Sequence, residues 1–342
     1  MTPKEIFLAA LAGRPGSTEP RLPRAATGSA TCVITTDLME RVGVSFPEAH
    51  LDAELMARLS AAGHTELGFD NILPMFSVVH EAYALGCRID WGGPTRMPDA
   101  RASRHYRMGE ELVIPADFLD HEGCRVALEA TKLVRQRYGD SVAIVGKAFG
   151  PWTLGFHLFG VEEFLIATLA DPDAVRRALS TLKEVTVRFA RAQIEAGADA
   201  ISLPDHATRE LCSPEAYRDF LADLHRELVE RIPAPIILHI CGDTADRIAF
   251  IRETGVACLH FDSRVPTRLA RELAGDRLRL MGGTSNFSVI REGTPEVIAA
   301  DVAEKLACRI EILGPECAVP LDAPWRNLKT FVAEAHRQSA RP

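Results

Sequence analysis

Two residues with metal-binding side chains, His239 and Cys241, stand two positions apart in this sequence. They follow the apolar run Pro235-Ile236-Ile237-Leu238, which is typical of a strand buried in a parallel sheet. Side chains two positions apart on a strand point to the same face. The spacing therefore predicts an imidazole and a thiol side by side at the C-terminal end of a strand, as two potential zinc ligands.

A third candidate ligand is Cys317, which follows another expected strand much later in the chain. Two thiolates and one imidazole suit zinc, and three protein ligands leave a fourth position open, as in catalytic sites. The two close C-x-x-C pairs of a typical structural zinc site are absent from the sequence. Three residues could close the fourth position instead, namely Asp262, His260 and Glu316.

A zinc ion with an open position favours one of two chemistries. A free thiol has a pKa near ~8.5 and is mostly protonated at neutral pH, whereas a thiol bound to zinc loses its proton and stays nucleophilic. Such a thiolate suits attack on a methyl carbon. Zinc-bound water attacking a carbonyl is the alternative, although hydrolases more often use His and carboxylate ligands.

Alternating helix and strand patterns must position these residues. The first helix begins with the capping box Thr2-Pro3-Lys4-Glu5, and Gly13 is expected to end it. Further helices are expected at 52–63, 121–138, 153–171, 172–196, 213 onward, 244–254, 266–274, 294–308 and 326–338. Strands are expected within 22–35 and 69–76, and at 142–146, 198–203, 235–241, 257–262, 278–283 and 309–313.

This alternation predicts an α/β fold, a (βα)8 TIM barrel with an N-terminal helical extension, formed by one domain over residues 1–342. A doubly wound open sheet is the alternative, but no G-x-G-x-x-G follows an early strand, which argues against a dinucleotide-binding version. The active sites of TIM barrels lie at the C-terminal ends of the strands. We therefore expect the polar residues at those ends to meet at one mouth: Asp205 and His206, His239 and Cys241, His260 and Asp262, Thr284 to Asn286, and Glu316 and Cys317.

The composition limits the class of protein. Of the 342 residues, 47% are hydrophobic and 25% are charged, which is ordinary for a soluble globular chain. The net charge is -8 and the basic residues form no stripe, so we expect no nucleic acid and no anionic membrane as partner. No apolar run approaches the ~20 residues of a membrane span, and the N-terminus does not look like a signal peptide. The eight cysteines are therefore expected to be reduced thiols, in a cytoplasmic protein.

Motifs along nearly the whole chain resemble the uroporphyrinogen decarboxylase superfamily. More specifically, the chain resembles its branch of methylcobalamin:coenzyme M methyltransferases and their corrinoid-dependent relatives. The branch assignment depends on the metal set, because most of the other motifs mark only the superfamily. These motifs are Thr2–Glu5 with Leu11–Gly13, Phe46–His50, Glu81–Gly92, Gly150–Thr153, Ala196–Ala200, Ser213–Glu215 and Glu316–Pro320.

The resemblance implies an activity and a set of ligands. In the methyltransferase branch the His-x-Cys pair and the late cysteine bind zinc, which carries over onto His239, Cys241 and Cys317. The zinc thiolate of the acceptor would attack the methyl group of a methylated corrinoid protein bound at the mouth of the barrel, and Co(I) would leave. The Arg-rich porphyrin-binding signature of the decarboxylases is missing from residues 20–36.

Four further residues are candidates for the site. Asp205 is placed to orient the acceptor or a zinc ligand, or to cap a helix. Asp262 is a candidate partner of His239 that would fix its tautomer. Trp152 is a candidate to flank the corrinoid, with burial in the core as the alternative. Asn286 belongs to 282–286, which could hold an anion with backbone amides or form a tight turn.

The acceptor is left open by the sequence. A thiol such as coenzyme M asks for a cation near its sulfonate, which Lys147 or Arg264 could supply. Tetrahydrofolate asks for a carboxylate or an amide near its pterin, which Asp205 or Asn286 could supply. The alternatives to methyl transfer are a metal-free decarboxylase acting on a porphyrinogen, and a non-catalytic partner of a corrinoid protein with a structural zinc.

Overall fold

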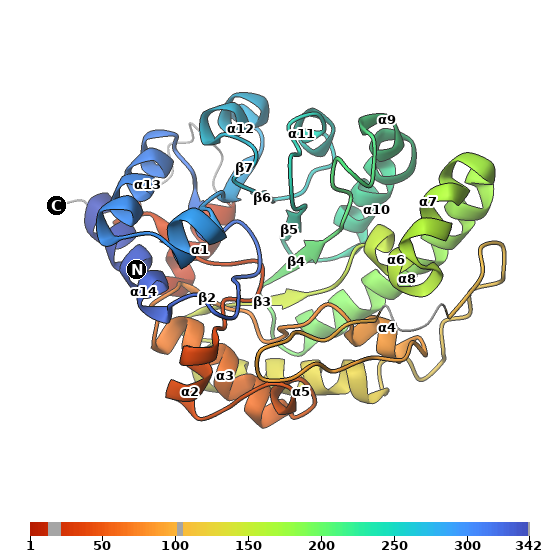
Figure 1. Cartoon of the computed structure of the whole chain (residues 1–342), viewed down its shortest axis with the longest axis horizontal. Coiled ribbons are helices and arrows are strands. Elements are labelled where there is room, and N and C mark those ends of the chain that lie inside the picture. Colours follow the sequence, from red (N-terminus) through yellow and green to blue (C-terminus); the bar gives the residue numbers. More distant parts are fainter. Residues whose placement is uncertain (13–21, 101–104, 341–342) are drawn as a thin grey trace.

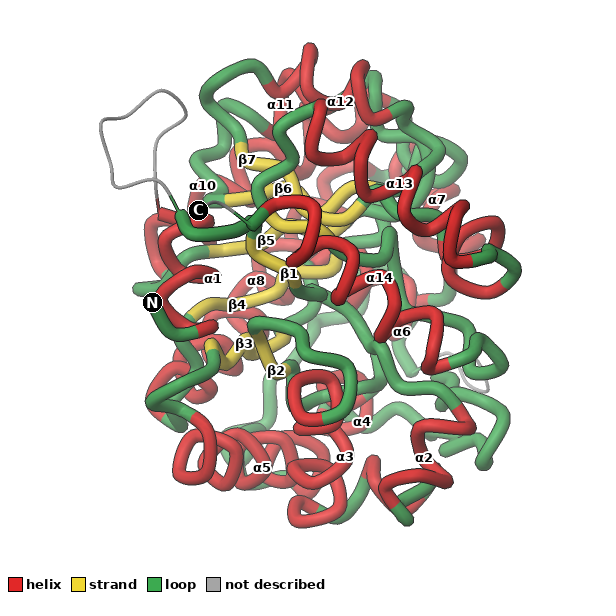
Figure 2. The backbone as a smooth tube through the Cα atoms, turned by 90° about the vertical axis from the view of Figure 1, so that its left-hand side faces the viewer, coloured by secondary structure: helices red, strands yellow, loops and turns green. Residues whose placement is uncertain are grey.

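A computed structural model describes residues 1–12, 22–100 and 105–340 of the chain. Its sheet has eight parallel strands in the order β1-β8-β7-β6-β5-β4-β3-β2, and helices surround the strands, as Figures 1 and 2 show. The strands are β1 (Ala26–Thr27), β2 (Asn71–Ile72), β3 (Ala143–Lys147), β4 (Ala200–Pro204), β5 (Ile236–His239), β6 (Cys258–Phe261), β7 (Arg279–Gly282) and β8 (Ile312–Leu313).

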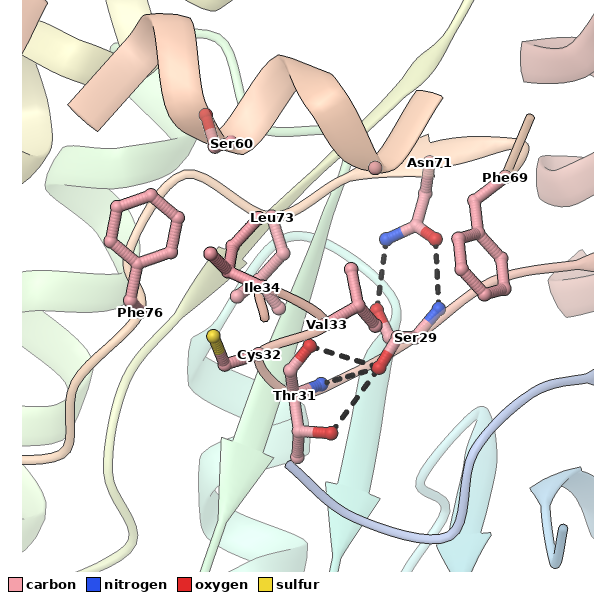
Figure 3. A pocket seen from close by; sticks show the side chains of 11 residues that line it. Ser29, Thr31, Cys32, Val33, Ile34, Ser60, Phe69, Asn71, Leu73 and Phe76 are labelled. Carbon is pink, nitrogen blue, oxygen red and sulfur yellow. Dashed lines mark hydrogen bonds between the residues drawn. The ribbon is translucent and has the colours of Figure 1, made fainter. Parts of the chain in front are cut away.

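The sheet closes into a barrel where β1 and β2 meet. The backbone amide of Asp70 donates to the carbonyl of Thr27 over 2.9 Å. Further along the same seam, the side chain of Asn71 accepts from the backbone amide of Ser29 and donates to its carbonyl, at 3.0 and 2.9 Å (Figure 3). The side-chain amide of Asn71 thus replaces backbone hydrogen bonds between β1 and β2. The predicted TIM barrel is confirmed.

Helix α1 (Pro3–Ala12) is the predicted N-terminal extension. Its capping box is formed, because Thr2 Oγ1 accepts from the amide of Glu5 and the Glu5 carboxylate accepts from the amide of Thr2. Its apolar side chains pack against the residues that fill the inside of the barrel. The backbone amide of Lys4 also donates to the carbonyl of Ser141, just before β3. Helix α1 therefore closes the N-terminal end of the barrel and leaves the other end free for a site. The expected helix end at Gly13 lies outside the described residues.

Most of the predicted helices are present with small shifts at their ends. They are α3 (Ala53–Thr65), α5 (Glu122–Tyr138), α8 (Pro172–Glu195), α12 (Thr267–Ala274), α13 (Pro295–Ala307) and α14 (Trp325–Ser339). The helix expected at 244–254 is only α11 (Ile248–Ile251). The segments that the sequence did not indicate are α2 (Thr36–Val42), the 3-10 helix η1 (Glu48–His50), α4 (His80–Ala84) and the π-helix η3 (Asn286–Arg291).

Two expected single helices are interrupted. The segment after β3 bends at Gly160, whose φ of +81° a glycine adopts without strain, and so divides into α6 (Pro151–Phe159) and α7 (Val161–Ala170). The segment opened by Ser213 runs as α9 (Pro214–Ala216), the π-helix η2 (Tyr217–Ala222) and α10 (Asp223–Arg231). In the described part of the chain no single helix has the length and apolarity to cross a membrane, and α6 and α7 reach them only together, bent by 111°.

Candidate active site and metal centre

The three predicted ligands meet at the C-terminal end of the barrel. His239 is the last residue of β5, Cys241 lies two residues beyond it, and Cys317 comes from the loop after β8. His239 Nε2 lies 3.0 Å from Cys241 Sγ, which lies 3.2 Å from Cys317 Sγ, and all three atoms are within 4.8 Å of one another. The chain thus brings two sulfurs and one imidazole nitrogen around one point, although Cys241 and Cys317 are 76 residues apart in the sequence.

The His239 ring is held by the neighbouring strand. Its Nδ1 donates to the backbone carbonyl of His260 over 3.2 Å, so the proton is on Nδ1 and the lone pair of Nε2 faces the sulfurs. The expectation that Asp262 makes this contact is wrong. Asp262 accepts instead from the backbone amide of Gly242 over 2.8 Å and thereby supports the turn that carries Cys241.

The Cys317 loop is held by a carboxylate and a histidine. Glu316 accepts from the backbone amides of Ser263, at 3.0 Å, and Asn286, at 2.8 Å, so one buried side chain links the loops after β6, β7 and β8. His260 Nε2 donates to the carbonyl of Pro315 over 2.8 Å. The sequence indicated Glu316 as a possible fourth ligand, and His260 as a possible fourth ligand, a residue supporting the ligands, or a plain core residue; their strand-end positions were the only signal of a supporting role.

Asn286 takes part in the same support. Its Nδ2 donates to the carbonyl of Ala318 over 2.9 Å, and its Oδ1 is buried without a hydrogen-bond partner. The side chain thus fixes the residue after Cys317, and it is not among the residues that line the cavity at the mouth of the barrel. A direct contact of Asn286 with a cofactor stays a prediction without support from this geometry.

The electrostatics of the trio favour a bound cation. The hydrogen bond from the Cys241 thiol, aided by the charge of His239, holds the pKa of Cys317 well below its usual range despite burial. The same bond raises the pKa of the Cys241 thiol, and burial raises it further. Burial lowers the pKa of His239, but the Cys317 thiolate outweighs burial, so that this pKa is raised overall. A divalent cation bound here would displace the thiol protons, while the neutral imidazole of His239 would bind through the lone pair of Nε2.

The donor set fits zinc. Ligand atoms of a tetrahedral Cys2His site lie about 3.5–3.8 Å apart for the usual Zn–S and Zn–N bond lengths. The separations of 3.0 Å between His239 Nε2 and Cys241 Sγ and 3.2 Å between the two sulfurs are only a little shorter, and the sulfurs are too far apart for a disulfide. Asp262, Glu316 and His260 are engaged with backbone groups. These engagements favour a fourth position that faces the cavity rather than one closed by a protein side chain.

An open cavity of about 600 Å3, a volume that includes solvent space at its mouth, adjoins the trio at the C-terminal end of the barrel. Lys147, from the end of β3, is the only lysine or arginine in its lining; it is buried and donates to the carbonyl of Phe76 over 2.9 Å. Burial lowers the pKa of Lys147 to about 8, although Cys32, Glu81 and Cys317 oppose this shift. The cavity is lined by Thr31, Cys32, Phe76, Val78, Lys147, Phe149, Thr153, His157, Pro204, Asp205, His206, His239, Cys241, Cys317 and Ala318.

Asp205 lies in the cavity wall but its oxygens are occupied. Oδ1 accepts from the backbone amide and the hydroxyl of Thr153, at 2.8 and 3.2 Å, which caps the N-terminus of α6. Oδ2 contacts His225 Nε2 at 3.0 Å, and His225 Nδ1 contacts the buried hydroxyl of Tyr217 at 2.9 Å. The helix-capping alternative is therefore formed in the structure, and Asp205 positions the wall that α6 contributes.

Trp152 does not face the cavity. Its side chain is fully buried and packs edge-on against Phe156 and Phe164, with ring centroids at 5.9 and 4.9 Å. The expectation that Trp152 flanks a corrinoid is therefore wrong, and the alternative of a buried core aromatic holds. Arg264 also lies away from the cavity lining, where its guanidinium pairs with Glu210.

A family model described as uroporphyrinogen decarboxylase (URO-D) matches residues 2–338. The chain belongs to the uroporphyrinogen decarboxylase family. Within this family it is 33% identical to the methylated-thiol–coenzyme M methyltransferase of Methanosarcina mazei, over 97% of this chain and 88% of the relative. It is 31% identical to the methylcobamide:CoM methyltransferase MtaA of Methanosarcina barkeri, over 97% of both chains.

A solved structure supports the same placement within the uroporphyrinogen decarboxylase family. A methyltransferase from Methanosarcina mazei superposes with a TM-score of 0.94 and 30% sequence identity, over 99% of each chain. The predicted fold and the predicted branch of the family are both confirmed by these full-length similarities.

Proposed function

We propose that this protein is a zinc-dependent methyltransferase that moves a methyl group between a methylcobamide and a small thiol. The observation that carries the proposal is the meeting of His239, Cys241 and Cys317 beside the cavity. The full-length similarity to methylcobamide:CoM methyltransferases supports the donor and the acceptor class. The methylcobamide would be presented by a corrinoid protein.

The side chains of this chain have distinct tasks in such a reaction. Zinc, when bound, would lower the pKa of the acceptor thiol so that it is a thiolate at neutral pH. The His260 carbonyl fixes the His239 tautomer, while Glu316 and Asp262 hold the loops of the two cysteines. The sulfur would form the new bond to the methyl carbon, while the carbon–cobalt bond breaks and its electron pair stays on cobalt. The thiol proton would leave through the cavity mouth.

The cavity favours a short thiol with an anionic end over tetrahydrofolate. Lys147 offers a buried ammonium group in the same cavity as the sulfur ligands, and an anion there would find little competing water. The two residues proposed for a pterin are poorly placed for it. Both carboxylate oxygens of Asp205 are already engaged, by Thr153 and by His225, and Asn286 lies outside the cavity lining. A sulfonate or carboxylate on the thiol is therefore the expected recognition element.

Replacing Lys147 by methionine tests this recognition. We expect KM for mercaptoethanesulfonate to rise about tenfold or more, because a charge-assisted contact of ~1.5–3 kcal/mol is lost, with little change for neutral mercaptoethanol. In the wild type, kcat/KM for the anionic thiol should fall relative to the neutral thiol as pH rises through about 8, since Lys147 is charged only below that pKa. Equal effects of the substitution on both thiols would refute the role of Lys147.

The proposed activity is tested with the purified wild-type protein. We expect about one zinc per chain, and demethylation of methylcobalamin that depends on an added thiol and appears as Co(I) absorbance together with a methyl thioether. Transfer to tetrahydrofolate in place of thiols would correct the acceptor. Turnover of uroporphyrinogen by chelator-treated protein would favour a decarboxylase, and methylcobalamin binding without transfer to any acceptor would favour a non-catalytic corrinoid partner.

A further inference from the structure

Helix α7 carries apolar side chains on two faces. Phe164 and Ala167 point inward and are buried. On the other side Val161, Ile166 and Leu169 are exposed by 38%, 57% and 89%. A helix that is apolar on its solvent side as well as its core side usually has a partner there, because soluble monomers seldom expose adjoining large apolar side chains.

The position of α7 places this exposed face beside the mouth of the barrel. Thr153 and His157 of the preceding helix α6 line the cavity, and α7 follows directly after the bend at Gly160. The next helix, α8, leads from α7 back to the start of β4. It has 24 residues and is about 36 Å long, about twice the length of the five-residue strand β4, so its first turns, next to α7, extend past the end of the strand. Figure 1 shows α6 and α7 beyond the arrowheads of β3 and β4, so they form a raised wall on that side of the mouth.

We propose that the exposed face of α7 is a docking surface for the protein that carries the methylcobamide. This inference rests on the proposed function. A cobamide, with its macrocycle and nucleotide tail, is much larger than the ligands that a cavity of about 600 Å3 encloses. The donor must therefore stay outside and present its methyl group through the mouth, and the protein around it must cover the rim that α7 forms.

The charges around α7 indicate what the partner surface looks like. From Val161 to Val175 the sequence has four acidic residues and no Lys or Arg. Asp171 caps α8 and Asp173 pairs with Arg176. Glu162 and Glu163 at the start of α7 are therefore the charges next to the apolar stripe, and a partner with basic residues around an apolar patch would complement them. Two copies of this chain meeting through α7 would bring like charges together, since Glu162 and its acidic neighbours would face their own counterparts.

The area of α7 also argues against simple self-association. One face of a helix of ten residues, about 15 Å long and 10 Å across, offers on the order of 200 Å2, far less than the roughly 800 Å2 per partner of a stable interface. A protein placed over the mouth would in addition meet other exposed apolar side chains near strand ends. Val78, 43% exposed, lines the cavity, and Phe287, 57% exposed, lies in η3 after β7. A donor over the mouth can thus reach the area that α7 alone does not provide.

The experiment compares two methyl donors in the full-length zinc protein with mercaptoethanesulfonate as acceptor. The donors are free methylcobalamin and a recombinant corrinoid-binding protein loaded with methylcobalamin. For the double variant Ile166→Glu/Leu169→Glu we expect kcat/KM with the protein-bound donor to fall at least tenfold, with free methylcobalamin used as by the wild type. The matched control is Leu269→Glu on α12, which is 38% exposed and lies between β6 and β7, whereas α7 lies between β3 and β4. It should change neither rate.

Each other outcome overturns the proposal. If the kcat/KM of the wild type is no higher with the protein-bound donor than with free methylcobalamin, no docking surface contributes to the reaction. If kcat/KM of the double variant falls equally with both donors at an unchanged melting temperature, α7 acts through the catalytic cavity. If sedimentation shows a wild-type dimer that the double variant dissociates, the surface pairs two copies of this chain. If the wild type uses neither donor, the proposed function itself fails, and this inference fails with it.

Discussion

Replacing Cys317 by alanine is expected to remove both the bound zinc and nearly all methyl transfer from methylcobalamin. Cys317 Sγ lies 3.2 Å from Cys241 Sγ, and the two thiolates would supply most of the negative charge that holds the cation. Loss of a supporting residue of a metal site costs ~10- to 100-fold in affinity or activity, and loss of a direct ligand should cost more. Metal analysis of the purified variant and the Co(I) absorbance assay measure the two effects, and Cys241→Ala and His239→Ala should behave alike.

A cysteine away from the trio provides the control. Cys308 is a partly exposed free thiol that follows α13, and Cys308→Ala should keep one zinc and wild-type activity. This comparison separates loss of the site from any general effect of losing a thiol. A Cys317→Ala protein that still holds zinc and transfers methyl groups at the wild-type rate would show that the late cysteine is no ligand, and the proposed chemistry would lose its basis.

The architecture was predictable because it depends on repeated local patterns. The apolar runs at 142–146, 198–203 and 235–241 alternate with amphipathic helices, and right-handed crossovers at that count close a barrel. Once the barrel is accepted, every strand end points to the same mouth. His239, Cys241 and Cys317 were therefore found from residue type and position alone, and the structure places them together.

The supporting contacts were not predictable in the same way. The proposed Asp262–His239 contact depended on side-chain type, but in the folded chain the imidazole takes a backbone carbonyl and the carboxylate takes a backbone amide. Trp152 was undecided between a position beside the corrinoid and burial in the core, because a single aromatic carries no periodic signal. Its place was settled by the bend at Gly160, which the sequence did not show and which folds α7 back over the tryptophan. Contacts of this kind depend on loop geometry, which sequence patterns describe least well.

Glu316 is a supporting residue whose hydrogen bonds hold the loop of Cys317. Its replacement by glutamine should have the second-largest effect on zinc binding. Each carboxylate oxygen accepts one backbone amide, from Asn286 and from Ser263, in a side chain that is only 7% exposed. Glutamine has one acceptor oxygen and would turn its NH2 group toward the second amide, which leaves two buried donors facing each other. We expect zinc affinity to fall ~10- to 100-fold and the free energy of unfolding to fall by about 1–3 kcal/mol. Titration against a zinc chelator and thermal unfolding measure the two quantities.

The matched control for Glu316→Gln is Glu292→Gln, which removes the same charge from an exposed residue at the end of η3. Glu292→Gln should leave zinc affinity unchanged, and an equal loss in both variants would show that a general loss of negative charge, and not the linkage of the three loops, is the cause. Saturating zinc should restore methyl transfer in Glu316→Gln, because His239, Cys241 and Cys317 are all still present. Unchanged zinc affinity in this variant would mean that the Cys317 loop keeps its place without Glu316, and that the hydrogen bonds of Asn286 and His260 to Ala318 and Pro315 are sufficient.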